Sequence, residues 1–347
     1  MNILNTSFER RSFEVEVKHS ILFECALGIA MITYPKLHDR LDKPKHYWDS
    51  VRSSFSEKLN ADLQFCQEHN TWKMLLQLLH VQEFSTLSEF IDYIEELTDQ
   101  ELKYKIIPYL DHTQQENRWL ASKGDADSEN KMILACKEHA FFPQMIQFIC
   151  NGDLSELRAH LKRVMEGWYK EFLGKQETEI KAILFRDENE KAKWLRSLKP
   201  VEAVLRATGT EYKPEPNISK VLLIPQHVYR PWTIQANLEE TRVFYYPVSD
   251  DSLAEASLTQ PPARLVHLFK SLGDEKRLRI VKLLRGKERT LKELTDLLGL
   301  GKTTVHHHLA LLRTAGIVKV NDAHYSLQET SFNQIEYQLE EYLERGE

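Results

Sequence analysis

The chain has 347 residues, with 46 lysines and arginines against 52 aspartates and glutamates, so its formal net charge at neutral pH is −6. This length predicts two domains, or a large domain with a small one. No apolar run approaches the ~20 residues that span a bilayer, and the polar N-terminus does not have the pattern of a signal peptide. Four cysteines without a pairing motif indicate reduced thiols. We therefore expect a cytoplasmic protein without membrane contact.

Residues 1–250 predict a mostly helical domain that carries a small sheet. Alternating side chains predict a strand at 13–17, and the apolar run after Ser20 predicts a helix that ends before Pro35. Two β-rich segments bounded by proline, 221–225 and 242–247, are candidates to pair with each other and with the first strand. Helical patterns account for much of the remainder, at 86–97, 101–110, 154–173 and 177–198.

No catalytic motif is found in this domain. It contains no nucleophile elbow, zinc-protease motif, Gly-rich dinucleotide turn or Cys-x-x-Cys pair, so we predict no catalytic residue and no cofactor. The spacing of His38 and His46 matches no metal motif, and both are expected at the surface. Several aromatic residues are candidates to line a pocket for an apolar effector, but such residues more often form plain core; they are Trp48, Trp72, Trp119, Trp168, Tyr169, Trp194 and Trp232.

A linker is predicted after the helical domain. Residues 249–262, with the sequence SDDSLAEASLTQPP, are acidic and small and end in two prolines. We accordingly divide the chain into a domain at 1–250, a linker at 251–262, a second domain at 263–330 and an amphipathic C-terminal helix at 331–347.

The second domain shows successive helices followed by a β-hairpin. Gly273, in a left-handed conformation, is expected to end a short helix, and Asp274 is a good N-cap for the next one. Thr290 and Glu293 form a capping-box pattern that starts another helix. A Gly-Leu-Gly turn then precedes a helix that begins near Lys302, and residues 317–327 alternate as two short strands around a turn.

The helix that begins near Lys302 has two distinct faces. Val305, Leu309 and Leu312 are spaced to join a core. Polar and basic residues are left to face outward; they are Lys302, Thr303, His306, His307 and Arg313. This layout is typical of a winged helix-turn-helix, in which the second helix of the motif enters the DNA major groove.

The segments KSLGDEKRLRIVKLL, TLKELTDLLGLGKTTVHHHLALLRTAGIV and HYSL resemble the DNA-binding domain of ArsR-type bacterial repressors. The resemblance covers about a fifth of the chain and runs without a gap through four elements. It implies that base edges are read by Gly301, Lys302, Thr303, His306 and His307. Arg313 and, from the short wing, Lys319 are added as DNA-binding residues, and His308 is given a structural role.

The metal-sensing function of that family is not carried over. Many of its members sense metals through a Cys-rich helix before the recognition helix, or through His and acidic residues on a C-terminal helix. The corresponding segments here, 291–298 and 332–345, contain neither Cys nor His, so we predict no metal site.

Two local patterns in this domain are misleading. Gly299–Thr304 resembles the end of a phosphate-binding P-loop, but Asp296 stands where that motif requires glycine. The run His306–His308 does not suit a metal ion, because consecutive helical residues point about 100° apart.

Charge is distributed unevenly along the chain. Residues 261–330 contain 13 lysines and arginines against seven acidic residues, whereas the rest of the chain has 33 against 45. A basic module on an acidic body is typical of a regulator with a separate DNA-binding domain.

From these observations we predict a bacterial transcription regulator, a repressor rather than an enzyme. It is expected to bind a palindromic operator in double-stranded DNA as a homodimer, and to respond to a small-molecule effector of unknown identity. The alternative is an enzyme or protein-interaction module in residues 1–250, with the winged helix as a targeting or autoregulatory appendage. A pocket in that domain gathering two or more titratable groups would favour the alternative.

Overall fold

The computed structural model describes residues 13–253, 261, 263–321 and 323–328, together with 335, 339, 340, 342 and 343. The chain divides into two compact units: unit 1 comprises residues 1–203 and 214–248, and unit 2 comprises 204–213 and 249–347. Most of the predicted linker, from 254 to 260, lies outside the described residues. No helix within the described ranges is long and apolar enough to cross a membrane.

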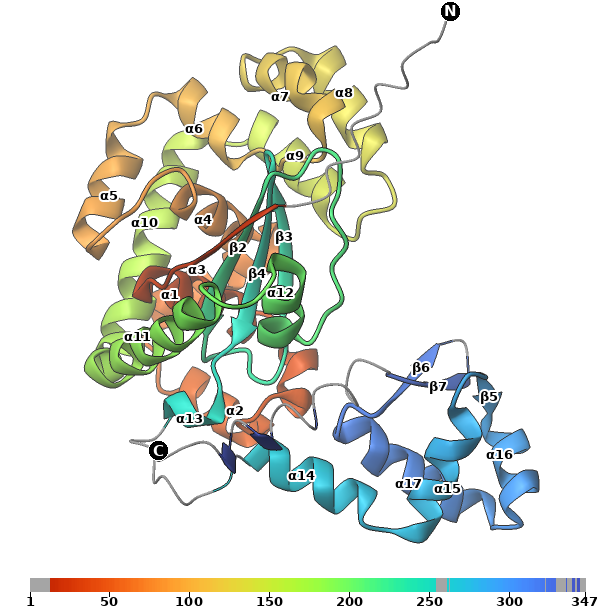
Figure 1. The fold of residues 1–347 in the computed structure, drawn as a ribbon. Helices are drawn as coiled ribbons and strands as arrows, with labels where there is room; N and C mark the ends of the chain where they lie inside the picture. The colour runs from red at the N-terminus through yellow and green to blue at the C-terminus, as the bar shows by residue number, and fades with distance from the viewer. Residues whose placement is uncertain are drawn as a thin grey trace, which may run out of the picture. The chain divides into compact units, whose positions relative to one another are not determined.

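Unit 1 contains a four-stranded sheet, seen near the centre of Figure 1, in the order β1-β2-β4-β3. Strands β1 (Glu14–Val17), β2 (Lys220–Gln226) and β4 (Thr241–Pro247) are parallel, and the antiparallel β3 (Ile234–Leu238) forms one edge. The predicted pairing of the three parallel strands is confirmed. Strand β3 was not predicted, because its sequence IQANL has little β-propensity and it is stabilised by pairing with β4.

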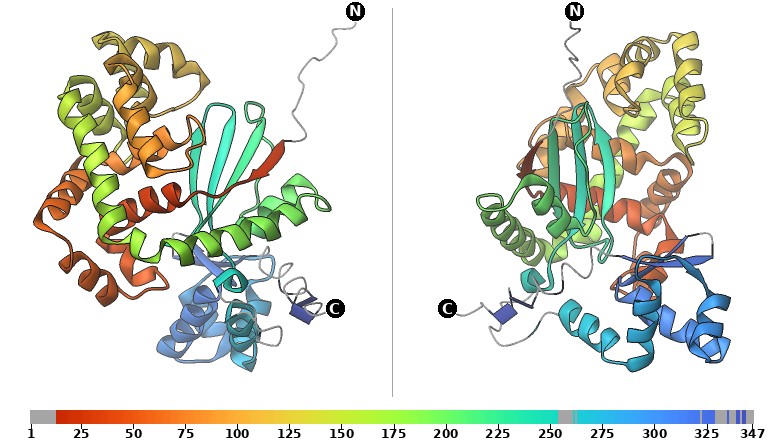
Figure 2. Two further views of the ribbon diagram at one scale, coloured as in Figure 1. Left: turned by 90° about the vertical axis from the view of Figure 1, so that its left-hand side faces the viewer. Right: turned by 45° about the vertical axis from the view of Figure 1, so that its right-hand side comes forward.

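The segment between β1 and β2 is almost entirely helical, and in the left view of Figure 2 most of its helices gather on one side of the strands. The mainly helical fold class is therefore confirmed. Helix α1 starts after Ser20, whose hydroxyl accepts a hydrogen bond from the backbone N–H of Leu22 at 3.2 Å. The helices are α1 (Ile21–Ile32), α2 (Lys45–Ser53), α3 (Glu57–His69), α4 (Thr71–Leu79), α5 (Leu87–Glu96), α6 (Asp99–Ile106), α7 (Gln115–Ser122), α8 (Ala126–Ala135), α9 (Phe142–Asn151), α10 (Leu154–Glu171), α11 (Glu177–Trp194) and α12 (Pro200–Thr208), with 3-10 turns at Pro35–Arg40, His112–Gln114 and Leu173–Gln176.

An aromatic cluster fills part of the core of unit 1. The ring of Trp168 lies 5.5 Å from that of Phe55 and 4.9 Å from that of Phe172, which in turn lies 6.1 Å from Trp48. Gly28 of α1 lets the indole approach closely, since an added Cβ would lie 2.7 Å from the Trp168 ring. Tertiary packing therefore accounts for the glycine in the middle of this helix.

The expectation that His38 lies at the surface is wrong, whereas His46 is exposed as predicted. His38 is buried, and its Nε2 lies 3.1 Å from the carbonyl oxygen of Met31. Its pKa is lowered, chiefly because burial disfavours the charged imidazole. The residue packs near Trp48, so its environment is set by contacts between segments rather than by local polarity.

Unit 2 contains the predicted helices and hairpin. Its elements are α13 (Asp250–Leu253), α14 (Ala263–Leu272), α15 (Glu275–Leu284), β5 (Arg289–Thr290), α16 (Leu291–Leu298), α17 (Lys302–Thr314), β6 (Val318–Asn321) and β7 (His324–Leu327). The hairpin β6–β7 gains a third strand, β5, that the sequence did not predict, and the sheet order is β5-β7-β6. Gly273 does not adopt the left-handed conformation expected of it; Gly299 and Gly316 do, with φ of 65° and 69°.

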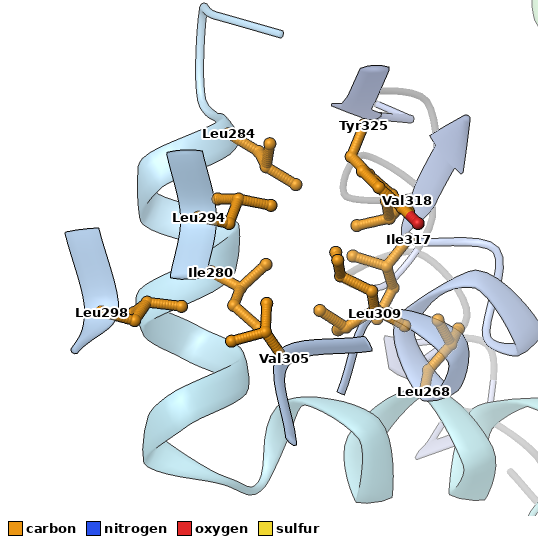
Figure 3. Close-up of a cluster of buried hydrophobic side chains, with 11 residues drawn as sticks. Leu268, Ile280, Leu284, Leu294, Leu298, Val305, Leu309, Ile317, Val318 and Tyr325 are labelled. Atoms are coloured by element: carbon orange, nitrogen blue, oxygen red, sulfur yellow. The ribbon is translucent and has the colours of Figure 1, made fainter. Parts of the chain in front are cut away.

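The core of the winged helix joins the helices α14–α17 to the hairpin. Figure 3 shows its side chains converging between these elements. The members are Leu268, Ile280, Leu284, Leu294, Leu298, Val305, Leu309, Leu312, Ile317, Val318 and Tyr325. Val305, Leu309 and Leu312 are the core positions predicted for the helix that begins at Lys302, and all three are buried.

Candidate nucleic-acid interface

Local chemistry at both ends of α16 positions α17. The Thr290 hydroxyl accepts the backbone N–H of Glu293, and the Glu293 carboxylate accepts the backbone N–H of Thr290 at 2.7 Å, which completes the predicted capping box. The hydrogen bonds that this carboxylate accepts from the backbone N–H of Thr290 and, second, from the Thr290 hydroxyl lower the pKa of Glu293. At the other end Gly299 takes the left-handed cap position, and Gly301 is the N-cap of α17.

The outward face of α17 is formed by polar and basic side chains. Lys302, Thr303, His306, His307 and Arg313 are all exposed, and their positions fall within an arc of roughly 140° on the helix. Gly301 is exposed directly before them, which leaves room for a close approach to the start of the helix. The arrangement offers short donors and cations on one continuous surface, as base edges and phosphates require.

Sequence reasoning overlooked Ala310. This residue is exposed and lies near the middle of the same arc, one turn after His306 and His307. A small apolar side chain has none of the polar or basic character that marks such a face in the sequence. A methyl group at the centre of a recognition surface allows close approach and suits contact with the methyl group of thymine.

The wing adds little charge. Lys319 is exposed on β6, opposite Ser326 of β7 in the antiparallel register. Arg289, on β5, donates from its Nε to the carbonyl oxygen of Leu283 at 2.8 Å, so its guanidinium is engaged within the unit.

His308 points inward and contacts the turn between α14 and α15. It is 8% exposed, and its Nδ1 lies 3.9 Å from the carboxylate of Asp274, the N-cap of α15. Arg277, whose backbone N–H caps onto Asp274 at 3.0 Å, donates from its guanidinium to the carbonyl oxygens of Ser271 and Lys270. Burial lowers the pKa of His308, while the Asp274 carboxylate acts in the opposite direction. His308 therefore packs on the inner side of α17, with its Nδ1 near Asp274 but not hydrogen-bonded to it.

The part of the chain that the structure describes contains no cluster of three or more His, Cys, Asp and Glu side chains arranged to hold an ion. Helix α16 has no such ligand apart from its acidic residues, and most of the segment 332–345 lies outside the described residues.

We expect zinc to leave the DNA affinity of this protein within a few-fold of its metal-free value. The reason is that the segments 291–298 and 332–345 supply neither a thiolate nor an imidazole. Fluorescence anisotropy of an operator duplex, with zinc titrated from nanomolar to micromolar concentrations, measures this directly. A tenfold shift that disappears on mutation within 291–298 or 332–345 would contradict the expectation.

One array in unit 1 has the order of a hydrolase triad. The Thr71 hydroxyl lies 2.8 Å from Nε2 of His160, whose Nδ1 lies 3.2 Å from the carboxylate of Asp62. All three side chains are buried, and Asp62 also accepts two hydrogen bonds from Arg163. Burial is the main cause of the lowered pKa of His160. The array joins α3, α4 and α10, and its burial suits a structural network rather than a site open to substrate.

Comparison with known proteins agrees with this geometry. Residues 274–320 match a family model described as "Bacterial regulatory protein, arsR family". The match runs from the N-cap of α15 into β6 and so covers α16, α17 and the start of the wing. A search of curated proteins found no match to the chain. The resemblance identified in the sequence is confirmed for this segment: the C-terminal unit carries the helix-turn-helix of a DNA-binding transcription regulator.

Proposed function

Because the C-terminal unit carries a helix-turn-helix of the ArsR type, we propose that the protein is a repressor that binds a palindromic operator as a homodimer. The observation that carries the proposal is the exposed polar arc of α17, held rigidly by a capped α16 and a continuous apolar core. Lys302, Thr303, His306 and His307 contact base edges, with Gly301 at the start of the helix. Arg313 and Lys319 contact phosphates. A repressor acts by occupying a site that polymerase or an activator would use, and needs no catalytic group.

We propose a dimer because of the small number of base pairs that one winged helix can contact. A single winged helix reads too few base pairs for genomic specificity, and two recognition helices one DNA turn apart, ~34 Å, read a two-fold site. The amphipathic C-terminal helix predicted at 331–347 has an apolar stripe, which consists of Phe332, Ile335, Leu339, Tyr342 and Leu343. Phe332 lies outside the described residues, Ile335 packs against the core of its own winged helix, and Leu343 is 68% exposed. Part of the stripe is thus used internally, and the exposed part is available to a second copy.

We expect a homodimer in solution and a palindromic operator. Sedimentation velocity at micromolar concentration, with and without a duplex, measures the mass of each species. A protein that stays monomeric both free and on DNA would contradict the dimer and the two-fold operator together.

Unit 1 supplies dimerisation, effector sensing or both, in a cytoplasmic protein that is not an enzyme. The alternative is an enzyme or interaction module in residues 1–250, and an enzyme there would need a reactive group that substrate can reach. Among the described residues the Thr71–His160–Asp62 array has the order of a catalytic triad, but all three of its side chains are buried. No observation favours that alternative over the regulator.

Genome-wide mapping of the sites that the full chain occupies tests the proposal. We expect discrete sites with inverted repeats and higher transcription of the adjacent genes after deletion of the protein. A uniform, sequence-independent distribution along the genome would overturn it. Specific binding should also weaken steeply with salt, because phosphate contacts release counterions.

A further inference from the structure

A cavity of about 480 Å³ lies beside the wing of unit 2. Its walls come from the residues that follow α12, the turn that follows α15, and the wing strands β6 and β7. All of them belong to unit 2, which includes the segment 204–213 as well as the winged helix. The volume falls within the range of small-molecule sites, about 300–1,000 Å³. The lining residues that carry the argument are Thr210, Glu211, Lys287, Glu288, Lys319 and Leu327.

Short turns and a paired strand hold the walls of this cavity. Gly209 follows α12 and Gly286 follows α15, and both adopt the left-handed conformation, with φ of 69° and 75°. The backbone N–H of Thr210 donates to the hydroxyl of Thr208 at 3.0 Å, which fixes the turn after α12. Lys319 lies on β6, which pairs with β7 in antiparallel register. The charged side chains at the cavity therefore start from backbone whose path is determined.

Four exposed side chains with full charges border the cavity, two of each sign. Lys287 and Lys319 are cationic at neutral pH, whereas Glu211 and Glu288 are anionic. Within the described part of the chain, none of the four forms an ion pair or a side-chain hydrogen bond. Lys287 lies within electrostatic reach of Glu293, but that carboxylate is already engaged in its capping box. The cavity thus brings together two cations and two carboxylates that no protein partner neutralises.

The signs of these charges select the ligand. A simple anion would pair with the two lysines but would also face the two glutamates, and a simple cation would meet the reverse problem. An uncharged ligand would displace water from four charges without replacing it. A molecule that carries both an anionic and a cationic group satisfies the whole lining. Leu327 is partly buried and adds an apolar part of the wall for the uncharged body of such a molecule.

We propose that this cavity binds a small zwitterion of about the size of a dipeptide. The carboxylate of the ligand pairs with Lys287 and Lys319, and its ammonium pairs with Glu211 and Glu288. The volume of the cavity sets the size, because a single small amino acid would leave much of the space to water.

Occupancy of the cavity bears on DNA binding through Lys319. In the function proposed above this lysine contacts a phosphate, and one ammonium cannot pair fully with a ligand carboxylate and a phosphate at the same time. The zwitterion should therefore weaken operator binding, and the operator should weaken binding of the zwitterion by the same factor. This regulatory role rests on the proposed repressor. Binding of the zwitterion does not, and is measured without DNA.

Saturation-transfer NMR on the full chain without DNA, with L-alanyl-L-alanine as the probe, tests the cavity. The two matched controls are the N-acetyl dipeptide, which keeps only the carboxylate, and the dipeptide amide, which keeps only the ammonium. We expect the free dipeptide to bind with a dissociation constant of about 1 mM or below. Each blocked form should bind about fivefold more weakly, the upper range for loss of an exposed ion pair.

Lys287→Met and Glu211→Gln should each weaken binding of the dipeptide, also by about fivefold. Their matched controls are Lys282→Met and Glu275→Gln, which remove the same charges from exposed positions of α15 outside the lining of the cavity. These two should leave binding unchanged. In fluorescence anisotropy with an operator duplex, saturating dipeptide should lower the DNA affinity of the unaltered chain, and Lys287→Met should reduce that effect.

Three results would overturn the site: no binding of the dipeptide, equal binding of its blocked forms, or binding that either cavity variant leaves intact. If a variant fails to fold, the comparison of the blocked forms still decides, because it uses the unaltered chain. Unchanged operator affinity at saturating dipeptide would refute the regulatory role alone. Absence of specific operator recognition, with dipeptide binding intact, would refute the proposed repressor and leave the site.

Discussion

Lys302→Ala and His307→Ala are each expected to weaken operator binding by about 1–3 kcal/mol, the usual worth of a good base contact. Both side chains are exposed on the outward face of α17 and take no part in the core of the winged helix. The Tm should therefore change little, while the affinity falls roughly 5- to 150-fold. Fluorescence anisotropy at physiological salt gives the affinity, and comparison of specific with unspecific duplexes separates base contacts from phosphate contacts.

Lys282→Ala is the matched control for the lysine. It removes the same charge from an exposed position on α15, outside the recognition helix. We expect an affinity loss well below that of Lys302→Ala and no change in sequence preference. If both recognition-helix variants kept full operator affinity, the assignment of α17 as the reading helix would be wrong.

Leu309→Ala is expected to cost about 2–5 kcal/mol of unfolding free energy, because a large buried side chain is lost and a cavity remains. Leu309 is 1% exposed and lies in the core of the winged helix, where Figure 3 shows its side chain beside those from the neighbouring elements. Since marginal stability is typical of small domains, the variant should lose much of its DNA binding at 37 °C. Urea denaturation followed by circular dichroism, resolved into the transitions of the two units, measures the effect.

Leu311→Ala removes the same atoms from the same helix at a position that is 37% exposed. It should cost less than about 1 kcal/mol, since surface substitutions have small effects on stability. Equal losses at Leu309 and Leu311 would mean that α17 is rotated relative to its described position, and the outward arc with it.

The elements of unit 2 could be predicted because their signals are local. The Thr290–Glu293 capping box and the Asp274 cap depend on side chains within a few residues of the backbone groups they bond. Val305 and Leu309 follow the helical period and so mark the core face of α17. The other residues of the helix then define its outward face. Arg289 of β5 was missed, because a two-residue strand forms only where β7 is available to pair with it.

In unit 1 the sequence determined the type of most elements but not their environment. The strands beginning at Glu14, Lys220 and Thr241 follow from β-propensity and proline boundaries, while β3 exists because β4 offers it a free edge. The burial of His38 was likewise unpredictable, since contacts with distant segments decide whether a polar residue is inside.

By itself, then, the sequence determined the recognition helix and the class of function, because helix caps, glycine turns and apolar periods act over a few residues. Only the tertiary structure decided what surrounds the polar groups of the large unit. Lys73 and Gln77 belong to a helical pattern that shows nothing unusual in the sequence alone. Their surroundings depend on which groups the fold brings beside them, such as the carbonyl oxygens of Lys105 and Ile107 that accept from Gln77, and on the burial that lowers the pKa of Lys73. Desolvation and hydrogen-bond satisfaction are properties of the packed interior, and spacing along the chain does not encode them.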